Sequence, residues 1–350
     1  MKIVVGLSGG VDSAVAAWLL REMGHEVVGV TLRTWEDGGS RCCAIDDARE
    51  TARHMGIPYH VINCACAFRK AVERPFVDEY LCGRTPNPCV VCNREVKWEW
   101  LLYAARLLCA DAVSTGHYAS VVRLESGRWT LRRATHKDQS YMLWRLSQEQ
   151  LSRTILPLGD LDKEEVRHIA KRAGLPVADK ADSQEICFVA QKQYASYVER
   201  HAPPHALRGG NFVDREGRIL GRHQGIVRYT VGQRRGLGLA LGRPVYVTDI
   251  RTATNEVVIG EEADLYRSEI QCTDLNWMSV PDAVSGERTW AAVQIRSHHK
   301  GEPARIVCDP DMLRIRFDQP VRAPTPGQSA VCYDGENRII CGGVIERGES

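Results

Sequence analysis

Apolar residues in the first 200 positions alternate between strand-like runs and helix-like spacings. Residues 2–7 form an apolar run rich in β-branched side chains, and residues 12–23 then carry apolar side chains at helical spacing before Gly24. The same alternation predicts strands at residues 27–32, 59–64 and 112–115, and helices at residues 46–55 and 95–108. Such an alternation indicates an α/β fold with a doubly wound, mostly parallel sheet, in which ligands bind beyond the carboxyl ends of the strands.

The pattern changes near residue 200, where Pro203-Pro204 and Gly209-Gly210 interrupt it. Residues 201–250 contain eight arginines against three carboxylates, within short β-like runs. From about residue 265 only short strands are expected, at residues 290–295, 304–308, 313–317, 329–333 and 339–345. This series favours a small antiparallel β-barrel. We therefore expect three domains: an α/β domain (1–200), a small central β-rich domain (201–264) and a C-terminal barrel (265–350).

Composition adds limits on where the protein works and what it binds. The 350 residues, 44% hydrophobic and 26% charged, suit a globular protein of two or three domains. We see no basic and apolar leader and no apolar run of membrane-spanning length, so we expect a cytoplasmic protein without a membrane partner. The net charge of +2 predicts no bulk attraction for polyanions, so a nucleic-acid site would need local basic clustering.

The first strand runs into the string Ser8-Gly9-Gly10-Val11-Asp12-Ser13, and a helix follows at once. Two glycines permit a tight turn, and the amides at the start of a helix favour an anion. Asp12 has two possible roles, holding a magnesium ion or capping the helix. No lysine follows the second glycine, so this is not a Walker A loop. The alternative is a glycine turn that only joins a strand to a helix.

The complete string resembles the pyrophosphatase-type loop (PP-loop) of enzymes that adenylate a carbonyl oxygen with ATP. Adenylation makes AMP the leaving group, so that a nucleophile can displace it. The loop does not say whether that nucleophile is ammonia, an amine or sulfur.

Thirteen cysteines make sulfur chemistry or metal binding plausible, because a disulfide framework is not expected in a reducing cytosol. Cys89 and Cys92 precede the predicted helix at residue 95, where the helix N-terminus is expected to lower a thiol pKa. Cys187 follows at the end of the α/β region. A 4Fe–4S cluster held by these three thiols is an alternative. For the cysteines in apolar surroundings we predict buried side chains without a role: Cys64, Cys109, Cys272, Cys308, Cys332 and Cys341.

Seven segments occur in the order found in one family, at residues 8–13, 83–93, 114–119, 137–141, 182–188, 229–238 and 325–328. Together they resemble the tRNA-specific 2-thiouridylases, essentially from end to end. The resemblance implies an adenine nucleotide alpha hydrolase-like catalytic domain. It also implies that ATP, with Mg²⁺, binds the loop and is lined by Leu32 and Gly116; the loop residues are Gly6, Leu7, Ser8, Gly9, Gly10, Val11, Asp12 and Ser13.

The resemblance further implies that the wobble uridine of tRNAs for Lys, Glu and Gln is adenylated at its C2 carbonyl. Cys187 would carry a persulfide supplied by a cysteine desulfurase or a sulfur-relay protein. Cys92 would be the second catalytic thiol, and the pair would close as a transient disulfide. The implied contacts with the flipped base are Asn87, Pro88 and Cys89, and those with the tRNA are His117, Lys137, Asp138, Gln139, Arg296, Ser297 and Gln328.

The chain departs from the family pattern in two places. Some members carry a carboxylate at the position of Cys89, and residues 293–299 replace a segment richer in tyrosine and arginine. On the residues alone, an arginine-rich glycine turn is a candidate for tracking an RNA backbone or is a solvated surface (Arg222, Arg228, Arg234 and Arg235). Two other functions compete: an amide-forming ligase that uses ammonia, and a noncatalytic RNA-binding regulator.

Overall fold

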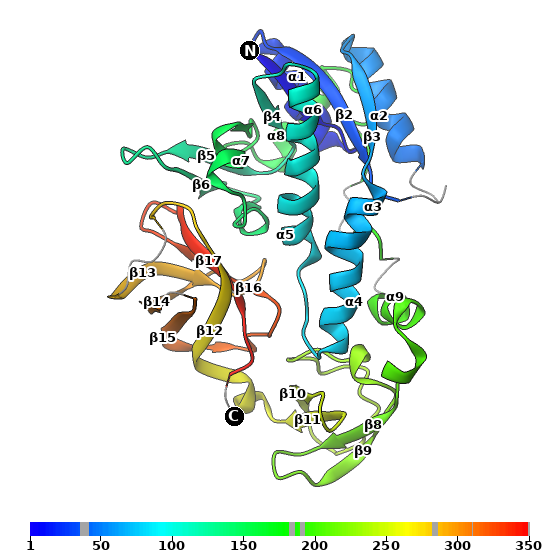
Figure 1. The fold of residues 1–350 in the computed structure, drawn as a ribbon, viewed down its shortest axis with the longest axis vertical. Helices are drawn as coiled ribbons and strands as arrows, with labels where there is room; N and C mark the ends of the chain where they lie inside the picture. The colour runs from blue at the N-terminus through cyan, green and yellow to red at the C-terminus, as the bar shows by residue number, and fades with distance from the viewer. Residues whose placement is uncertain (36–41, 182–185, 190–192, 282–285, 310, 349–350) are drawn as a thin grey trace.

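In the computed structural model, the described residues are 1–35, 42–181, 186–189, 193–281, 286–309 and 311–348. The chain forms three modules (Figure 1). The α/β module lies at one end and a small four-stranded sheet at the other, with a barrel beside the helices that connect them. Within the described residues, no helix combines the length and the apolar character needed to cross a membrane.

The α/β module is built on a five-stranded parallel sheet of order β3-β2-β1-β4-β7. Its strands are β1 (Lys2–Gly6), β2 (Glu26–Arg33), β3 (Tyr59–Asn63), β4 (Ala112–Ser114) and β7 (Thr154–Ile155). Side chains alternate between faces along β1. Ile3 and Val5 pack against one group of helices, and Val4 packs on the opposite face. The predicted doubly wound α/β fold is therefore confirmed.

The helices that cover the sheet follow from this alternation. On the face of Ile3 and Val5 lie α1 (Val11–Glu22), α2 (Cys42–Met55) and α8 (Lys163–Arg172). On the face of Val4 lies α6 (Glu99–Leu107). A hairpin of β5 (Ala119–Arg123) and β6 (Trp129–Arg133) extends from the sheet, followed by the short helices η3 (Ser140–Met142) and α7 (Gln148–Ser152).

The helix predicted from residue 95 begins earlier, at Pro88. It runs through α5 (Pro88–Cys92), the π-helical η2 (Asn93–Trp98) and α6. Proline suits the first turn of a helix, because the missing N–H would have no partner there. A second helical segment descends beside it in Figure 1: α3 (Ala65–Phe68), η1 (Arg69–Glu73) and α4 (Arg74–Leu81).

The central module is a four-stranded sheet of order β10-β11-β8-β9. Its strands are β8 (Gly210–Val213), β9 (Ile219–His223), β10 (Tyr246–Arg251) and β11 (Glu256–Gly260), and α9 (Tyr194–His201) leads into it. An aromatic core joins it to α4, where Phe76 packs edge-on against Tyr197 and the rings of Tyr80 and Tyr194 stack. The short helices η4 (Pro204–Ala206), η5 (Ile226–Arg228) and η6 (Glu262–Leu265) complete this part of the chain.

The C-terminal module is a closed antiparallel barrel of order β12-β15-β14-β13-β16-β17, which confirms the predicted barrel. Its strands are β12 (Tyr266–Trp277), β13 (Gly286–Gln294), β14 (Glu302–Cys308), β15 (Leu313–Arg322), β16 (Ser329–Tyr333) and β17 (Ile339–Ile345). Strand β12 was not predicted, because its first four residues are exposed and polar or aromatic and so give no alternating pattern.

Candidate active site

The glycine-rich loop joins β1 to α1 at the carboxyl edge of the sheet. Gly9 has φ +70°, and a Cβ there would lie 2.3 Å from the carbonyl oxygen of Ala44, so only glycine fits. The Ser13 hydroxyl accepts from the amide of Ser8 (3.1 Å) and donates to the carbonyl of Gly10 (3.0 Å). These bonds hold the loop in shape around the N-terminus of α1, where an anion is favoured.

Asp12 is surrounded by cations rather than acting as a cap. Its Oδ1 accepts from the Tyr118 hydroxyl (2.7 Å) and from Lys163 Nζ (2.6 Å). Lys137 Nζ lies 3.8 Å from its Oδ2. The N-cap of α1 is Gly10, which has no side-chain cap bond, so the capping role predicted for Asp12 is wrong. A carboxylate flanked by lysine ammonium groups does not fit a resident magnesium site, because the ammonium charges repel a divalent cation.

Lysines give this loop a positive surrounding that the sequence did not indicate. Besides Lys163 and Lys137, Lys180 donates to the carbonyl of Gly9 (2.8 Å) and pairs with Asp47. Lys163 and Lys180 lie far from the loop in sequence and belong to no recognised string. The arrangement suits an anionic polyphosphate.

The two other residues assigned to the nucleotide lie at the same edge of the sheet. Gly116 follows β4 and contacts the start of α1, since a Cβ on it would lie 2.5 Å from the Ser13 amide nitrogen. Leu32 is near the end of β2 and packs against the cluster that contains Cys92. Leu32 therefore connects the nucleotide edge of the sheet with the thiols.

Cys92 ends α5 and is 7% exposed, among Cys64, Phe68, Val72 and Val96. Burial raises the pKa of Cys92 to about 12, although the charge of Lys97 acts in the opposite direction. Burial also raises the pKa of Cys89. The expected lowering of both pKa values is thus wrong, because the loss of solvent outweighs the charge of Lys97.

Cys187 is exposed and lies close to Cys92, although the two are far apart in sequence. The neighbouring Phe188 packs edge-on against Phe68 (ring centroids 5.5 Å apart) at the border of the Cys92 cluster. Cys187 is near enough to raise the pKa of Cys92 electrostatically. The structure therefore brings together the two predicted catalytic thiols. Residues 182–185 of the predicted segment lie outside the described residues.

The described residues give the iron–sulfur alternative no support. Among them, no three Cys, His, Asp or Glu side chains are grouped so that they would hold a metal ion. Cys89, Cys92 and Cys187 are all described, and they do not make such a group. A bound cluster requires all its thiolates within bonding distance of iron, so the residues do not fit it here.

Several residues assigned to the RNA by resemblance have partners within the protein. Gln328 Nε2 donates to the carbonyls of Thr85 (2.8 Å) and Pro86 (3.3 Å), just ahead of α5. Asn87 Nδ2 lies 3.7 Å from Met142 Sδ, and Pro88 is the buried first residue of α5. Their RNA contacts stay predictions, and Gln328 has a structural role that the motif alone did not indicate.

Three other residues assigned to the tRNA by resemblance are His117, Arg296 and Ser297. His117 Nδ1 bonds the Thr115 hydroxyl (2.8 Å), and its ring lies 5.6 Å from that of Trp98. Burial, with a smaller contribution from the Lys97 charge, lowers the pKa of His117 to about 3, so the ring is neutral near pH 7. Arg296 is exposed after β13, and Ser297 follows it.

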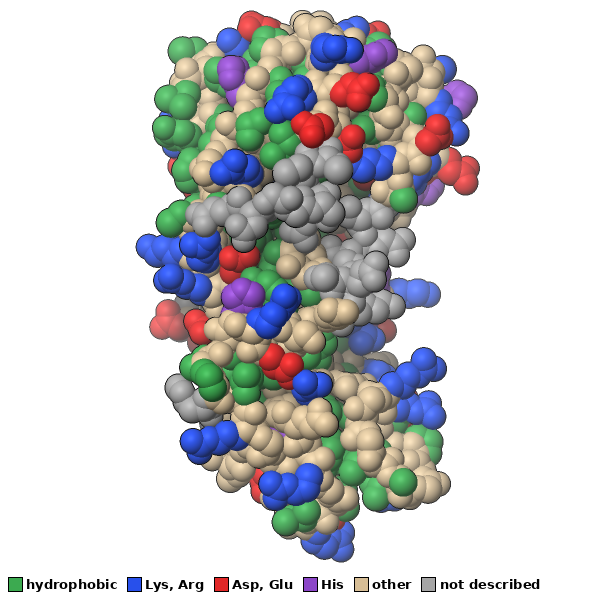
Figure 2. All heavy atoms as spheres, turned by 90° about the vertical axis from the view of Figure 1, so that its right-hand side faces the viewer, with side chains coloured by type: hydrophobic (Ala, Val, Ile, Leu, Met, Phe, Trp, Pro, Cys, Tyr) green, Lys and Arg blue, Asp and Glu red, His purple; other side chains and the backbone are tan. Residues whose placement is uncertain are grey.

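An arginine-rich hollow lies on the central module. A cavity of ≈ 1030 Å³ is lined by Tyr194, Thr230, Gln233 and the predicted arginines, Arg222, Arg228, Arg234 and Arg235. Arg228 pairs with Glu199 (2.6 Å), and the other three have no carboxylate partner among the described residues. Lys and Arg side chains are spread over this end of the molecule, at the bottom of Figure 2. The hollow suits a phosphate backbone.

The fold and the loop together define a nucleotide-binding α/β protein with two neighbouring thiols and a C-terminal barrel. Family models match all three modules. One described as the tRNA methyl transferase HUP domain matches residues 1–191, and one described as the tRNA methyl transferase PRC-barrel domain matches residues 195–261. A third, the aminomethyltransferase beta-barrel domain, matches residues 267–345.

Two proteins that match this chain over nearly their full length carry the same name. A protein of Lachnoclostridium phytofermentans is 48% identical over 98% of this chain and 99% of its own, and one of Clostridioides difficile is 44% identical over 99% and 98%. Both are named tRNA-specific 2-thiouridylase MnmA. A solved 4-thiouridine synthetase–RNA complex with bound ATP is 20% identical, with a TM-score of 0.36 over 59% of this chain and 52% of that one. The chain belongs to the tRNA-specific 2-thiouridylase family.

Proposed function

We propose that this protein is an ATP-dependent tRNA 2-thiouridylase, a tRNA-uridine 2-sulfurtransferase that acts on the wobble uridine at position 34. The tRNAs would be the Lys, Glu and Gln isoacceptors, and a cysteine desulfurase or sulfur-relay protein would supply the persulfide in the cytoplasm. We assign the ATP chemistry to residues 1–200, RNA binding to residues 201–264 and the barrel to residues 265–350. Family membership supports the reaction type.

The chemistry has two stages. ATP bound at the loop is attacked by the C2 oxygen of the uridine, which releases pyrophosphate and leaves an adenylated base; Mg²⁺ would arrive with the nucleotide. The outer sulfur of a Cys187 persulfide then attacks C2 and AMP leaves. Cys92 attacks the Cys187 sulfur, which frees 2-thiouridine and leaves a Cys92–Cys187 disulfide for an external thiol to reduce.

The observation that carries this proposal is the proximity of Cys187 to Cys92 beside the nucleotide edge of the sheet. The raised pKa of Cys92 means that its thiol is protonated at rest. The attack on the Cys187 sulfur needs a thiolate. Lys97, held by Asn93 Oδ1 at 2.9 Å, is the nearby cation that favours the thiolate form.

Serine substitutions test the two thiols. Cys187→Ser is expected to lower 2-thiouridine formation on the order of 10³-fold or more, because the sulfur carrier is lost. Binding of tRNA should stay within about twofold of the wild type, because the substitution changes one atom. Cys82→Ser, at another exposed cysteine, is the matched control. Thiolation is measured by nucleoside analysis after digestion.

Cys92→Ser gives the same experiment a second readout. The persulfide sulfur still reaches C2, but no thiol releases it, so a disulfide adduct between protein and tRNA should accumulate. A gel run without reductant detects the adduct, and added dithiothreitol should remove it. Unchanged 2-thiouridine in either variant would contradict the assignment, as would an amide-forming activity that survives both substitutions.

A further inference from the structure

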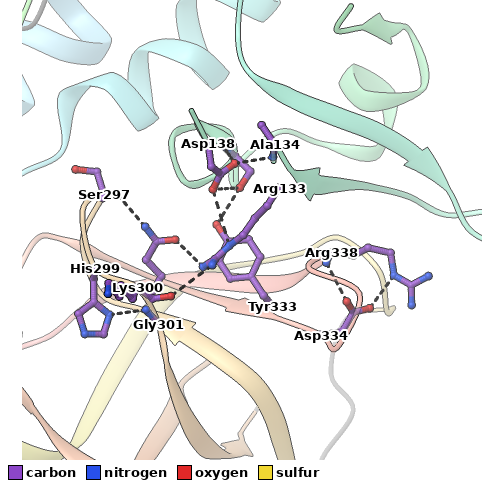
Figure 3. A network of polar contacts seen from close by, with 12 residues as sticks. Arg133, Ala134, Asp138, Ser297, His299, Lys300, Gly301, Tyr333, Asp334 and Arg338 are labelled. Carbon is purple, nitrogen blue, oxygen red and sulfur yellow. Dashed lines mark hydrogen bonds and ion pairs between the residues drawn. The ribbon is translucent and has the colours of Figure 1, made fainter. Parts of the chain in front are cut away.

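A buried polar cluster joins the barrel to the hairpin of the α/β module (Figure 3). Arg133, the last residue of β6, lies with its Cζ 3.7 Å from the ring centroid of Tyr333 at the end of β16. Its Nη2 donates to Gln294 Oε1 (2.8 Å) at the end of β13. We call Arg133, Asp138, Ser140, Gln294 and Tyr333 the Arg133 cluster. Arg133 Nη1 also donates to the carbonyl of Lys300 (3.4 Å), so three barrel residues hold one arginine of the α/β module.

Within the cluster, Asp138 fixes the turn that follows β6. It accepts from the amides of Ala134 (3.1 Å) and Ser140 (3.0 Å) and from the Ser140 hydroxyl (2.9 Å). The same hydroxyl lies 3.1 Å from the hydroxyl of the buried Tyr333. Asp138, assigned to the RNA by resemblance, therefore has its carboxylate occupied inside the protein.

The turn held by Asp138 leads directly to the phosphate loop. Gln139 makes two hydrogen bonds with the backbone of Tyr118. Its Oε1 accepts from the Tyr118 amide (3.0 Å), and its backbone amide donates to the Tyr118 carbonyl (2.8 Å). Tyr118 in turn donates its hydroxyl to Asp12 (2.7 Å). Lys137 lies 5.2 Å from the centroid of the Tyr118 ring and 3.8 Å from Asp12 Oδ2. Contacts thus run without a break from the barrel to the loop.

One N–H group of the Arg133 guanidinium makes no hydrogen bond with the described residues. Its Nε is buried without a hydrogen-bond partner, and Asp138 Oδ2 is 3.8 Å away. An unpaired buried donor is unfavourable, so its surroundings must stabilise it by other contacts. The ring of Tyr333 and the carboxylate of Asp138 supply them.

We propose that Arg133 is a positioning residue for the nucleoside triphosphate, through which Tyr333 and Gln294 of the barrel hold Lys137 beside the phosphate loop. The barrel is then part of the ATP site and not only a surface for RNA. This inference rests on the proposed ATP chemistry. Lys137, assigned to tRNA by resemblance, lies 3.8 Å from Asp12 Oδ2 and so beside the loop that would hold the polyphosphate.

The test is binding of a nonhydrolysable ATP analogue to the full chain, without RNA, by calorimetry. Arg133→Gln is expected to weaken binding about 3- to 30-fold, the range found for residues that act through a contact network. Arg133→Lys, which keeps the positive charge, should lie between it and the wild type. The control is Arg132→Gln, the exposed neighbour on β6 that pairs with Asp160 (3.3 Å); it should change the affinity less than about twofold.

A double-mutant cycle separates positioning from general loosening. In a Lys137→Ala background, Arg133→Gln should cost much less affinity, because the residue it positions is already gone. Equal losses in both backgrounds would overturn the proposal, as would wild-type affinity in Arg133→Gln. If Arg133→Gln does not fold, Gln294→Ala removes the same hydrogen bond from the barrel side and decides the question. A wild-type protein that binds no analogue would instead refute the proposed ATP chemistry itself.

Discussion

At the scale of single residues, His117 shows how burial sets a protonation state. Its pKa is lowered to about 3 in the folded protein, whereas an unfolded histidine has a pKa of about 6.5. Between these values the unfolded chain binds a proton that the folded protein does not. The free energy of unfolding therefore falls as the pH falls from about 6.5 towards 3, by at most about 1.4 kcal/mol per pH unit.

This difference predicts how a substitution changes the pH dependence of stability. In His117→Gln the titrating group is absent, so the loss of unfolding free energy between pH 7.5 and pH 5 should shrink by about 1–2 kcal/mol. Urea unfolding at both pH values measures this difference, whatever the substitution costs at neutral pH. His136, an exposed histidine, provides the control as His136→Gln. If the free energy of unfolding of His117→Gln falls between pH 7.5 and pH 5 as much as that of the wild type, the folded protein protonates this ring.

The residues around Asp12 show where sequence reasoning at this scale ends. The string from Ser8 to Ser13 predicts a phosphate loop, because its glycines and its place before a helix carry local physical meaning. Lys163 and Lys180 reach the loop only through the packing of α8 and the segment after it. Nothing local marks a lysine as the partner of a residue 150 or more positions away. The capping role expected for Asp12 failed for the same reason.

At the scale of elements, a barrel loop clamps the segment that leads into α5. The amide of Thr85 donates to the carbonyl of Pro326 (2.8 Å), and Gln328 bonds the carbonyls of Thr85 and Pro86. Gly327 between them has φ +90°, and a Cβ there would lie 2.9 Å from the Thr85 oxygen. The 325–328 segment thus sets the start of the helix that carries Cys92.

This contact predicts a cost for any side chain at Gly327. Gly327→Ala should lower the free energy of unfolding by about 1–3 kcal/mol, because the positive φ and the close carbonyl both oppose a Cβ. It should also lower thiolation, because α5 must shift. Gly335→Ala is the matched control in the same barrel, since no atom lies within 4 Å of its added Cβ. Equal free energies of unfolding of the two variants, measured with urea, would contradict the clamp.

The sequence predicted the elements whose apolar side chains are buried in a core. Strand β1 is a short apolar run buried on both faces, and helix α1 carries its apolar side chains at helical spacing against one core. The helix that carries Cys92 was predicted to begin near residue 95, whereas it begins at Pro88, since a first-turn proline needs no N–H partner. The hairpin of β5 and β6 was missed because it is short and its residues are mostly half-exposed.

At the scale of the whole molecule, the three modules are bound to one another by specific contacts. Arg84, which follows α4, pairs with Glu79 (2.7 Å) and with Glu346 after β17. Glu346 also accepts a hydrogen bond from Thr273 of β12 (2.6 Å). A cavity of ≈ 350 Å³ lies between the helices η1, α4 and α5 on one side and the barrel on the other. Together with the Arg133 cluster, these contacts link the barrel to α4 and to the turn that contacts the glycine-rich loop. No local sequence pattern predicts the pair of Arg84 and Glu346, since the two residues lie in different modules.

The arginine-rich hollow gives the whole molecule a measurable property. Each phosphate neutralised by the protein lowers the slope of log K against log salt by about 0.7 for single strands and 0.9 for duplexes. Arg234 and Arg235 are exposed and line the hollow. Removing both as Arg234→Gln with Arg235→Gln should therefore reduce the magnitude of the slope for tRNA by roughly 1.4 to 1.8.

The control must change the net charge equally on the same module. Arg215 and Arg218 meet this need, because both are exposed and already paired, with Asp264 and Asp214 at 2.6 Å. Filter binding of tRNA across a range of potassium chloride concentrations gives the slope for each double variant. If the hollow holds the backbone, only the Arg234 and Arg235 variant loses slope, because counterions are released only where phosphates are contacted. Equal losses in the two variants would trace the slope to net charge, and no loss in either would place the RNA elsewhere.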